Sequence, residues 1–351
     1  MSTITTISGL ASGQAVLRSS IDRLTRQVTT GQRGVLQGDL GPEARRAIDL
    51  RGEIARRDAY VGAADRALAR SGAAQDVMTR LNDIAGSLSA QAKRAKTLGE
   101  TEVVALARSA RSALEEAAAL LNTRHAGEYL FGGSDVAAPP VPDAAGIADG
   151  PMATAIAASV ATLDATNAAT ILAAAAAAAV DPASTPFSVF LEGNGLEGNG
   201  MTEARRAVQV ADGDRIAIGV LPLRGQPEGS GTPWGRDLLR DLAVLAALTP
   251  AQAVEAEGWM ALMDGVTGGL DGAAEGLAAE QGMLGSAEQR VGAARERHED
   301  TKVALRKQLG LAEEVDLAEA SAQLRAVQSR LEASYEVTGM VSRLSLAALL
   351  R

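Results

Sequence analysis

Apolar residues return at alternating steps of three and four positions in two long stretches of this sequence. The first stretch, Ala44 to Leu121, carries the series Val77, Leu81, Ile84, Leu88, Ala92, Ala95 and Leu98. The second repeats the pattern, with Glu280, His298 and Thr301 as polar interruptions, through Met263, Val266, Leu270, Ala273, Leu277, Leu284, Ala287, Val291, Ala294 and Leu305. Such spacing places side chains on one helix face, and a sustained series is typical of coiled-coil packing. The sequence therefore predicts long helices that pack along a shared seam.

The second stretch is rich in glycine. Between Gly258 and Gly292 it also contains Gly265, Gly268, Gly269, Gly272, Gly276, Gly282 and Gly285. Each glycine in a helix interior costs about 1 kcal/mol relative to alanine, so this helix is expected to be unstable in isolation. Only 2% of the residues are aromatic, so the core must consist of Ala, Leu and Val. We therefore expect neighbouring helices to stabilise the stretch and to approach it closely at its small residues.

Both ends of the chain carry the same spacing in shorter form. The N-terminal series ends before Gly31, and the C-terminal series continues from Leu317 into a markedly apolar end at Leu350. An exposed apolar surface of this kind marks an interaction site. We interpret the apolar residues of the two series as an assembly seam, formed by Leu17, Ile21, Leu24, Val28, Leu324, Val327, Leu331, Val341 and Leu344.

The middle of the chain has a different composition. Pro139, Pro140 and Pro142 end the first helical region, and Thr232-Pro233 precedes the return to helix. Residues 135–235 contain β-like runs at Phe187–Leu191 and Arg215–Val220 and a turn signal at Asp212-Gly213. They also contain 11 acidic and 4 basic residues, so this segment carries −7 of the net charge of −9. We interpret it as an inserted domain.

The predicted fold is mainly α with a smaller α+β insert. Long antiparallel, coiled-coil-like helices come from both ends of the chain and are nested around a central variable domain. We divide the chain into terminal helices at 1–40 and 310–351, a long-helix core domain at 41–134 and 236–309, and an acidic insert with β-hairpins at 135–235.

Several classes of protein do not fit this sequence. The 43 acidic against 34 basic residues argue against a dedicated nucleic-acid binder, which needs a basic face. The longest apolar run, Ile171–Val180, is shorter than the roughly 20 residues that span a bilayer, and no cleavable signal peptide is visible. With no cysteine and only His125 and His298 as histidines, we expect no metal, no cofactor and no catalytic residue. His298, on the helix seam, is expected to be a packed or solvated side chain.

One motif points to another class of function. Gly193-Asn194-Gly195-Leu196-Glu197-Gly198 matches the G-x-G-x-x-G fingerprint of dinucleotide-binding proteins and follows the strand-like run Phe187–Leu191. The same residues belong to a tandem Leu-Glu-Gly-Asn-Gly repeat that readily forms turns, and the insert is small for two nucleotide-binding halves. The Asn and Glu oxygens are also candidate calcium ligands, although no EF-hand pattern is present. A nucleotide-binding enzyme that uses the Gly193–Gly198 loop is the alternative from another class.

Three segments carry a family signature. Ile21–Arg33 reads as a helix followed by small polar residues, a glycine and a basic residue. Leu324–Leu350 includes Gln328, Ala333-Ser334-Tyr335 and Ser342-Arg343-Leu344-Ser345-Leu346, and Glu128–Gly133 reads Glu-Tyr-Leu-Phe-Gly-Gly. The first two segments resemble the ends of the bacterial flagellin family, and the third resembles the segment before the variable domain in its hook-filament junction branch. The resemblance covers roughly residues 1–134 and 236–351.

This resemblance implies a structural subunit of the bacterial flagellum that joins a hook-side adaptor to the filament. It implies export through the flagellar type III apparatus without a cleavable signal peptide, and assembly outside the cell. In the family the terminal helices are disordered in the monomer and pack as an inner coiled coil in the polymer, while the insert faces outward. The implied partners are the hook-side adaptor, flagellin, further copies of the chain and an export chaperone on the C-terminal helix, with no nucleic acid and no membrane insertion. The absence of cysteine suits a chain that is exported unfolded.

Two alternatives remain besides the nucleotide-binding enzyme. Tyr129–Gly133 and the modest length of 351 residues favour the junction branch, and a filament subunit is the alternative within the family. Gly38–Arg46 departs from the acid-rich segment common after the first helix, so contacts made there in relatives are not carried over. A coiled-coil scaffold that is never exported is the alternative outside the family.

Overall fold

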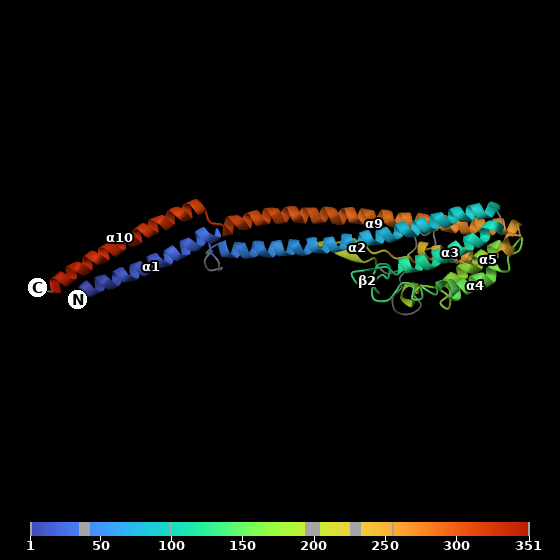
Figure 1. The fold of residues 1–351 in the computed structure, drawn as a ribbon, viewed down its shortest axis with the longest axis horizontal. Helices are drawn as coiled ribbons and strands as arrows, with labels where there is room; N and C mark the ends of the chain where they lie inside the picture. Colours follow the sequence, from blue (N-terminus) through green and yellow to red (C-terminus); the bar gives the residue numbers. More distant parts are fainter. Residues whose placement is uncertain are drawn as a thin grey trace. The chain divides into compact units, whose positions relative to one another are not determined.

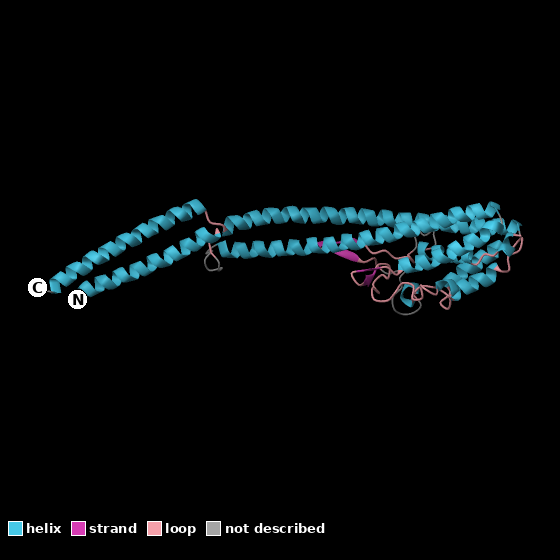
Figure 2. Cartoon of the chain, viewed as in Figure 1, coloured by secondary structure: helices cyan, strands magenta, loops and turns pink. Residues whose placement is uncertain are grey.

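The computed structural model describes residues 2–34, 43–98, 100–193, 204–224, 233–254 and 256–349. Helices dominate these residues, and only short strands accompany them (Figure 2). The chain divides into two compact units. We call residues 1–59 with 298–351 the terminal unit and residues 60–297 the central unit. The mainly α fold with a small β component is the one predicted from the sequence.

The terminal unit contains α1 (Ser2–Thr30), α10 (Leu317–Leu349), the first part of α2 (Glu43–Leu98) and the last part of α9 (Ala256–Glu313). Helices α1 and α10 lie side by side and run antiparallel, with their outer ends together (Figure 1). Within the same unit α2 and α9 also pair, through ion pairs of Arg51 with Glu313 and of Lys302 with Asp58, each at 2.7 Å. Helices from the two ends of the chain therefore pack together, as the seam pattern predicts.

The central unit holds the remaining parts of α2 and α9, which pack along their predicted apolar faces. Gln75 Nε2 donates to the carbonyl of Gln281 at 3.0 Å, and Ser89 Oγ and Lys93 Nζ both donate to Asp271. The predicted seam positions are buried, namely Val77, Leu81, Ile84, Leu88, Ala92 and Ala95 on α2 and Met263, Val266, Leu270, Ala273, Leu277, Leu284, Ala287, Val291 and Ala294 on α9. The seam prediction for this part of the chain is confirmed.

The predicted continuous helix from Ala44 to Leu121 is instead two helices. Helix α2 ends at Leu98, and α3 (Glu100–Leu121) folds back along it, so that Arg80 pairs with Glu116 at 2.7 Å. The reversal lets α3 bury its own apolar face against α7 (Trp234–Ala246). The three-four spacing did not reveal the reversal, because it shows which residues share a helix face and not where the chain turns.

At three glycines of α9 a neighbouring atom occupies the space that a Cβ would need. A Cβ atom on Gly258 would lie 2.0 Å from the carbonyl oxygen of Asp164, and one on Gly269 would lie 1.9 Å from Asp241 Oδ2. At Gly265 the nearest atom would be a methyl carbon of Leu172, at 2.2 Å. Close approach at small residues is therefore confirmed at these positions. Gly268, Gly272 and Gly282 face open space.

The rest of the central unit is a helical layer with two short hairpins. Helices α4 and α5 pack on each other and on α7, close to α3 (Figure 1). The hairpins are antiparallel, and Gly213 takes the turn of the second with φ +78°. The remaining elements, in chain order, are β1 (Arg124–His125), β2 (Glu128–Tyr129), the 3-10 turn η2 (Ile147–Asp149), α4 (Pro151–Val160), α5 (Ala168–Val180), α6 (Val189–Glu192), β3 (Ala207–Ala211), β4 (Asp214–Ala217) and α8 (Pro250–Ala253).

One of the two predicted β-like runs is wrong. Phe187–Leu191 leads into the helical turn α6, whose start is capped by Ser188 Oγ accepting from the amide of Leu191 at 3.4 Å. Phe187, just before the turn, and Leu191 within it are both buried. The second run, Arg215–Val220, is a strand only as far as Ala217. A hairpin with its turn at Asp212-Gly213 is present, as predicted.

Buried charges in the central unit are paired. Glu280, which interrupts the α9 seam, accepts hydrogen bonds from Nη1 and Nη2 of Arg205. On α7, Arg240 donates from Nε and Nη2 to the two oxygens of Asp241, each at 2.8 Å. Burial raises the pKa of the Asp241 carboxyl to about 6, and Arg240 opposes that shift. Removing one partner of such a pair leaves a buried charge uncompensated, which strongly destabilises the fold.

Candidate assembly interface

The contact between α1 and α10 brings the predicted seam residues of both helices together. Leu24 is buried at 4% exposure, and Leu17, Ile21 and Val28 are half-buried on the same face of α1. On α10, Leu324, Val327, Leu331 and Val341 are half-buried in the same way, while the side chain of Leu344 lies outside the described residues. The periodic apolar face of each helix is thus its least exposed face. Among the described residues α1 and α10 pack mainly on each other, and one neighbouring helix leaves these side chains half-buried.

Polar contacts set the register of this helix pair. Gln14 Nε2 donates to Thr338 Oγ1 at 2.9 Å, and Arg18 donates from Nε and Nη2 to Tyr335 Oη at 2.9 and 2.7 Å. The Arg18 guanidinium also lies 5.7 Å from the centre of the Tyr335 ring, within the range of a cation–π contact. These contacts join residues more than 300 positions apart, so the sequence did not identify Gln14 or Arg18. Tyr335 was noted only as part of the family signature, without a partner.

The inner end of the helix pair is closed by backbone hydrogen bonds. Gly31 ends α1 with φ +71°, the left-handed conformation that glycine adopts without strain. Beyond it, Arg33 donates its amide to the carbonyl of Glu313 at 2.7 Å, and Val315 donates to the carbonyl of Gly31 at 3.0 Å. Asp316 Oδ1 then caps the start of α10 by accepting the amides of its first residues. The Gly-Gln-Arg sequence noted at 31–33 therefore forms the junction between α1 and the end of α9.

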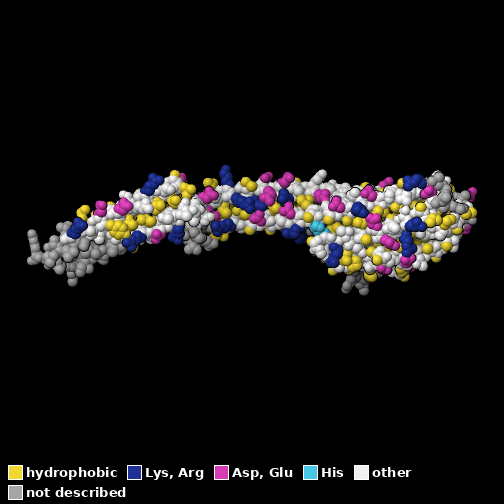
Figure 3. Space-filling model, in the orientation of Figure 1, with side chains coloured by type: hydrophobic (Ala, Val, Ile, Leu, Met, Phe, Trp, Pro, Cys, Tyr) yellow, Lys and Arg dark blue, Asp and Glu magenta, His cyan; other side chains and the backbone are white. Residues whose placement is uncertain are grey.

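Large apolar side chains remain exposed on the outside of this helix pair. Met340 is 61% exposed, Val337 47%, Leu317 50% and Val16 64%. On the visible face of α1 and α10, hydrophobic side chains gather between scattered charges (Figure 3). An apolar surface on both the inside and the outside of a helix pair is typical of helices that need further neighbours.

The EYLFGG segment forms part of the central unit's core. Phe131 is fully buried and meets Trp234 edge to face, with ring centres 6.4 Å apart. Gly132 is required because a Cβ there would lie 2.5 Å from the carbonyl oxygen of Asp135, and Gly133 has φ +67°. The segment therefore makes a tight turn that joins the end of α3 to the insert.

The structure does not support a nucleotide site at the glycine-rich loop. The dinucleotide fingerprint needs a strand before the loop, whereas α6 precedes Gly193, which ends that helical turn with φ +69°. Residues 194–198 lie outside the described residues, so the candidate calcium ligands Asn194 and Glu197 do too. Within the described ranges, no group of three or more histidine, aspartate or glutamate side chains is placed to hold a metal ion.

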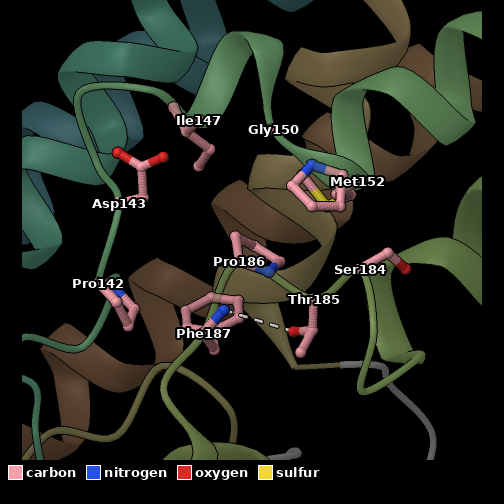
Figure 4. Close-up of a pocket in the computed structure, with 10 residues that line it drawn as sticks. Pro142, Asp143, Ile147, Gly150, Met152, Ser184, Thr185, Pro186 and Phe187 are labelled. Carbon is pink, nitrogen blue, oxygen red and sulfur yellow. Dashed lines mark hydrogen bonds between the residues drawn. The ribbon is translucent and has the colours of Figure 1, made fainter.

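A small cavity in the insert is also unsuited to a nucleotide. It has a volume of about 140 Å³, below the roughly 300 Å³ at which small-molecule sites begin. Pro186, Phe187 and Met152 line it, with Asp143 at its edge (Figure 4). One oxygen of Asp143 accepts the amide of Gly146 at 3.0 Å, and the amide of Phe187 is held by Thr185 Oγ1. These polar groups serve the local turns.

The two histidines lie in separate units. His298 is buried, as the packed alternative predicts, and its Nδ1 lies 3.4 Å from Nη1 of Arg57. His125 belongs to β1 in the central unit. In the part of the chain that the structure describes, no helix combines the length and apolar character needed to cross a membrane.

A comparison with models of protein families gives a match on the C-terminal side of the helix pair. Residues 267–350 match the family model of the bacterial flagellin C-terminal helical region. The matched range takes in most of α9 and the described part of α10, including every predicted seam residue of the C-terminal series. A search of curated proteins gave no match. The C-terminal half of the assembly interface is thus similar to the C-terminal helical region of the bacterial flagellins, which supports that family for this chain.

Proposed function

We propose that this chain is a structural subunit of the bacterial flagellum that assembles through α1 and α10. The observation that carries the proposal is the half-buried seam between these helices, in a region similar to the flagellin C-terminal helical region. Leu24 alone of the nine seam residues is buried among those described, so further helices are needed to enclose the rest. Neighbouring copies of the same helix pair provide them.

The energetics favour coupled ordering and assembly. Fully burying a large aliphatic side chain contributes about 2 kcal/mol, so enclosing what remains exposed of Val16, Leu317, Val337 and Met340 contributes about 4 kcal/mol per subunit. Ordering the backbone costs about 1 to 2 kcal/mol per residue, and a lone pair of helices with a half-buried seam is marginal against that cost. We therefore propose that residues 1–40 and 310–351 become stably ordered on polymerisation.

Within the flagellum we propose the role of the hook-filament junction protein (hook-associated protein 3). The EYLFGG turn at Glu128–Gly133 supports this assignment, and filament flagellin is the alternative. In this proposal residues 41–134 and 236–309 form the next shell, and residues 135–235 face outward. The chain reaches the cell exterior by type III export without a cleavable signal peptide, with a chaperone on the C-terminal helix. Its neighbours are the hook-side adaptor, flagellin and further copies of itself, and it carries no enzymatic activity.

Seam variants test the assembly role. Val327→Asp places a charge on the half-buried seam, and Ala326→Asp places the same charge on the adjacent exposed position of α10. We expect Val327→Asp to abolish incorporation into flagella in a complementation assay, while Ala326→Asp retains substantial incorporation. Incorporation of Val327→Asp at the wild-type level would refute the role of the seam.

A deletion strain separates the junction and filament roles. Loss of a junction protein leaves hooks without filaments and releases flagellin monomer into the medium, whereas loss of a filament subunit releases none. Immunogold labelling gives the matching positional test, at the hook tip or along the filament. Retention of the protein inside the cell would instead favour the scaffold that is never exported.

A further inference from the structure

A basic groove in the central unit has no part in the assembly interface. It has a volume of about 540 Å³ and lies between α2, the β1–β2 hairpin and β3. Its charged lining residues are Arg66, Arg70, Glu128 and Arg206, and His125 lines it as well. Alanines of α2, with Val208 and Ile218, supply an apolar wall. An apolar wall strengthens the field of the charges beside it, because it excludes the solvent that screens them.

Positive charge in this groove exceeds the negative charge that faces it. Arg70 and Arg206 both donate to the same oxygen of Glu128, at 3.3 and 2.6 Å. Arg66, one helical turn before Arg70, lines the same groove and has no hydrogen bond or ion pair with any described residue. Three arginines therefore line a groove that holds one carboxylate, which leaves two positive charges without a negative partner in its lining.

The innermost arginine is held firmly. The side chain of Arg70 is only 11% exposed, and its Nη2 donates to the carbonyl of Tyr129 at 2.7 Å. Burial lowers the pKa of Arg70, and the nearby charge of Arg206 lowers it further, while Glu128 offsets only part of this. A bound anion would offset the repulsion between Arg70 and Arg206.

The outer arginine is also positioned by the backbone. The amides of Ile218 and Gly219 both donate to the carbonyl of Arg206, at 2.8 and 2.9 Å. A Cβ on Gly219 would lie 2.5 Å from the Arg206 amide nitrogen, so the two segments are in direct contact. The groove thus combines arginines of α2 and of the segment before β3 with the carboxylate of Glu128 on β2.

We propose that this groove binds a small dianion of the phosphate or sulfate class, free or as a monoester, through Arg66 and Arg206. The two uncompensated charges match a dianion. Guanidinium groups present paired donors that fit the oxygens of phosphate and sulfate. The volume falls within the range of small-molecule sites and leaves room for a monoester of a small alcohol. Arg70 sets the charge at the inner end of the groove without leaving its contacts to the β2 backbone.

Calorimetric titration of the full chain tests the proposal, with inorganic phosphate, inorganic sulfate and glucose 6-phosphate as probes. Ionic strength is held constant with NaCl, so that general salt effects cancel. We expect saturable binding of phosphate and sulfate. Arg66→Gln and Arg206→Gln should each weaken binding roughly tenfold, and the double variant should abolish it. A Kd for glucose 6-phosphate equal to or lower than that for phosphate identifies the monoester as the fitting ligand, and a weaker one identifies the free anion.

The matched control is Arg94→Gln, which removes an exposed arginine of α2 that does not line the groove. It should bind phosphate and sulfate like the wild type. Circular dichroism checks that each variant keeps its helix content, and Arg66→Lys with Arg206→Lys provides a second pair that retains the charge and part of the affinity. Absence of saturable binding of either inorganic anion by the wild type, or equal binding by the double Gln variant, overturns the proposal.

Discussion

Two adjacent glycines of α9 are expected to respond with opposite signs to the same substitution. Gly268 faces open space, whereas a Cβ on Gly269 would lie 1.9 Å from Asp241 Oδ2 and 2.9 Å from Arg240 Nη2. Glycine to alanine in a helix interior gains about 1 kcal/mol, and nothing opposes this gain at Gly268. At Gly269 the new methyl group must displace a fully buried carboxylate from its two hydrogen bonds to Arg240.

The cost at Gly269 follows from that ion pair. Breaking a buried pair destabilises by about 3 to 5 kcal/mol, so the net effect of Gly269→Ala after the propensity gain is a loss of about 2 to 4 kcal/mol. Gly268→Ala should raise the free energy of unfolding by up to about 1 kcal/mol. Urea unfolding of the monomer, followed by circular dichroism at 222 nm, measures both. If Gly269→Ala is as stable as Gly268→Ala, the close packing of α9 on α7 is not the reason for glycine at that position.

Three further predictions address the buried charges and the helix pair. Because the folded-state pKa of Asp241 is raised to about 6 from 3.8, the folded protein binds more protons than the unfolded chain between these values. The free energy of unfolding of the wild type should therefore fall relative to that of Asp241→Asn as pH rises from 4 to 6, and equal slopes would contradict the assignment. Glu280→Ala leaves Arg205 without its buried partner and should cost about 3 kcal/mol in urea unfolding, whereas an effect under about 1 kcal/mol would mean that the pair is solvated. Leu24→Ala should increase hydrogen exchange throughout α1 and α10, while Val16→Ala, at an exposed position, should leave it unchanged, and an equal response of the two would show that the helices are not paired through Leu24.

The periodic faces of the helices could be predicted because they depend on local spacing. Residues three and four apart share a helix face whatever the chain does elsewhere, so the α2 and α9 seam positions were identified from the sequence. The same holds for Leu24 and its half-buried neighbours on α1. That α1 and α10 polymerise through these faces stays a prediction.

Errors arose where a local pattern had two structural solutions. Phe187–Leu191 is apolar enough for a strand, but Ser188 caps a helical turn there, and Phe187 and Leu191 are both buried in the core. The three-four spacing likewise could not show that the chain reverses after Leu98. In both cases packing against other helices selected one solution.

The amino-acid sequence by itself determined which faces of the helices are apolar and that Ala, Leu and Val supply most of the core. Only the tertiary structure decided which faces meet, why Gly269 rather than Gly268 has no room for a side chain, and that Glu280 is paired with Arg205. It also decided that Arg70 and Arg206 meet at Glu128 and that Arg66 lines the same groove. The physical reason is that helix periodicity is a property of neighbouring residues, whereas close approach and charge pairing join residues that are distant in the chain.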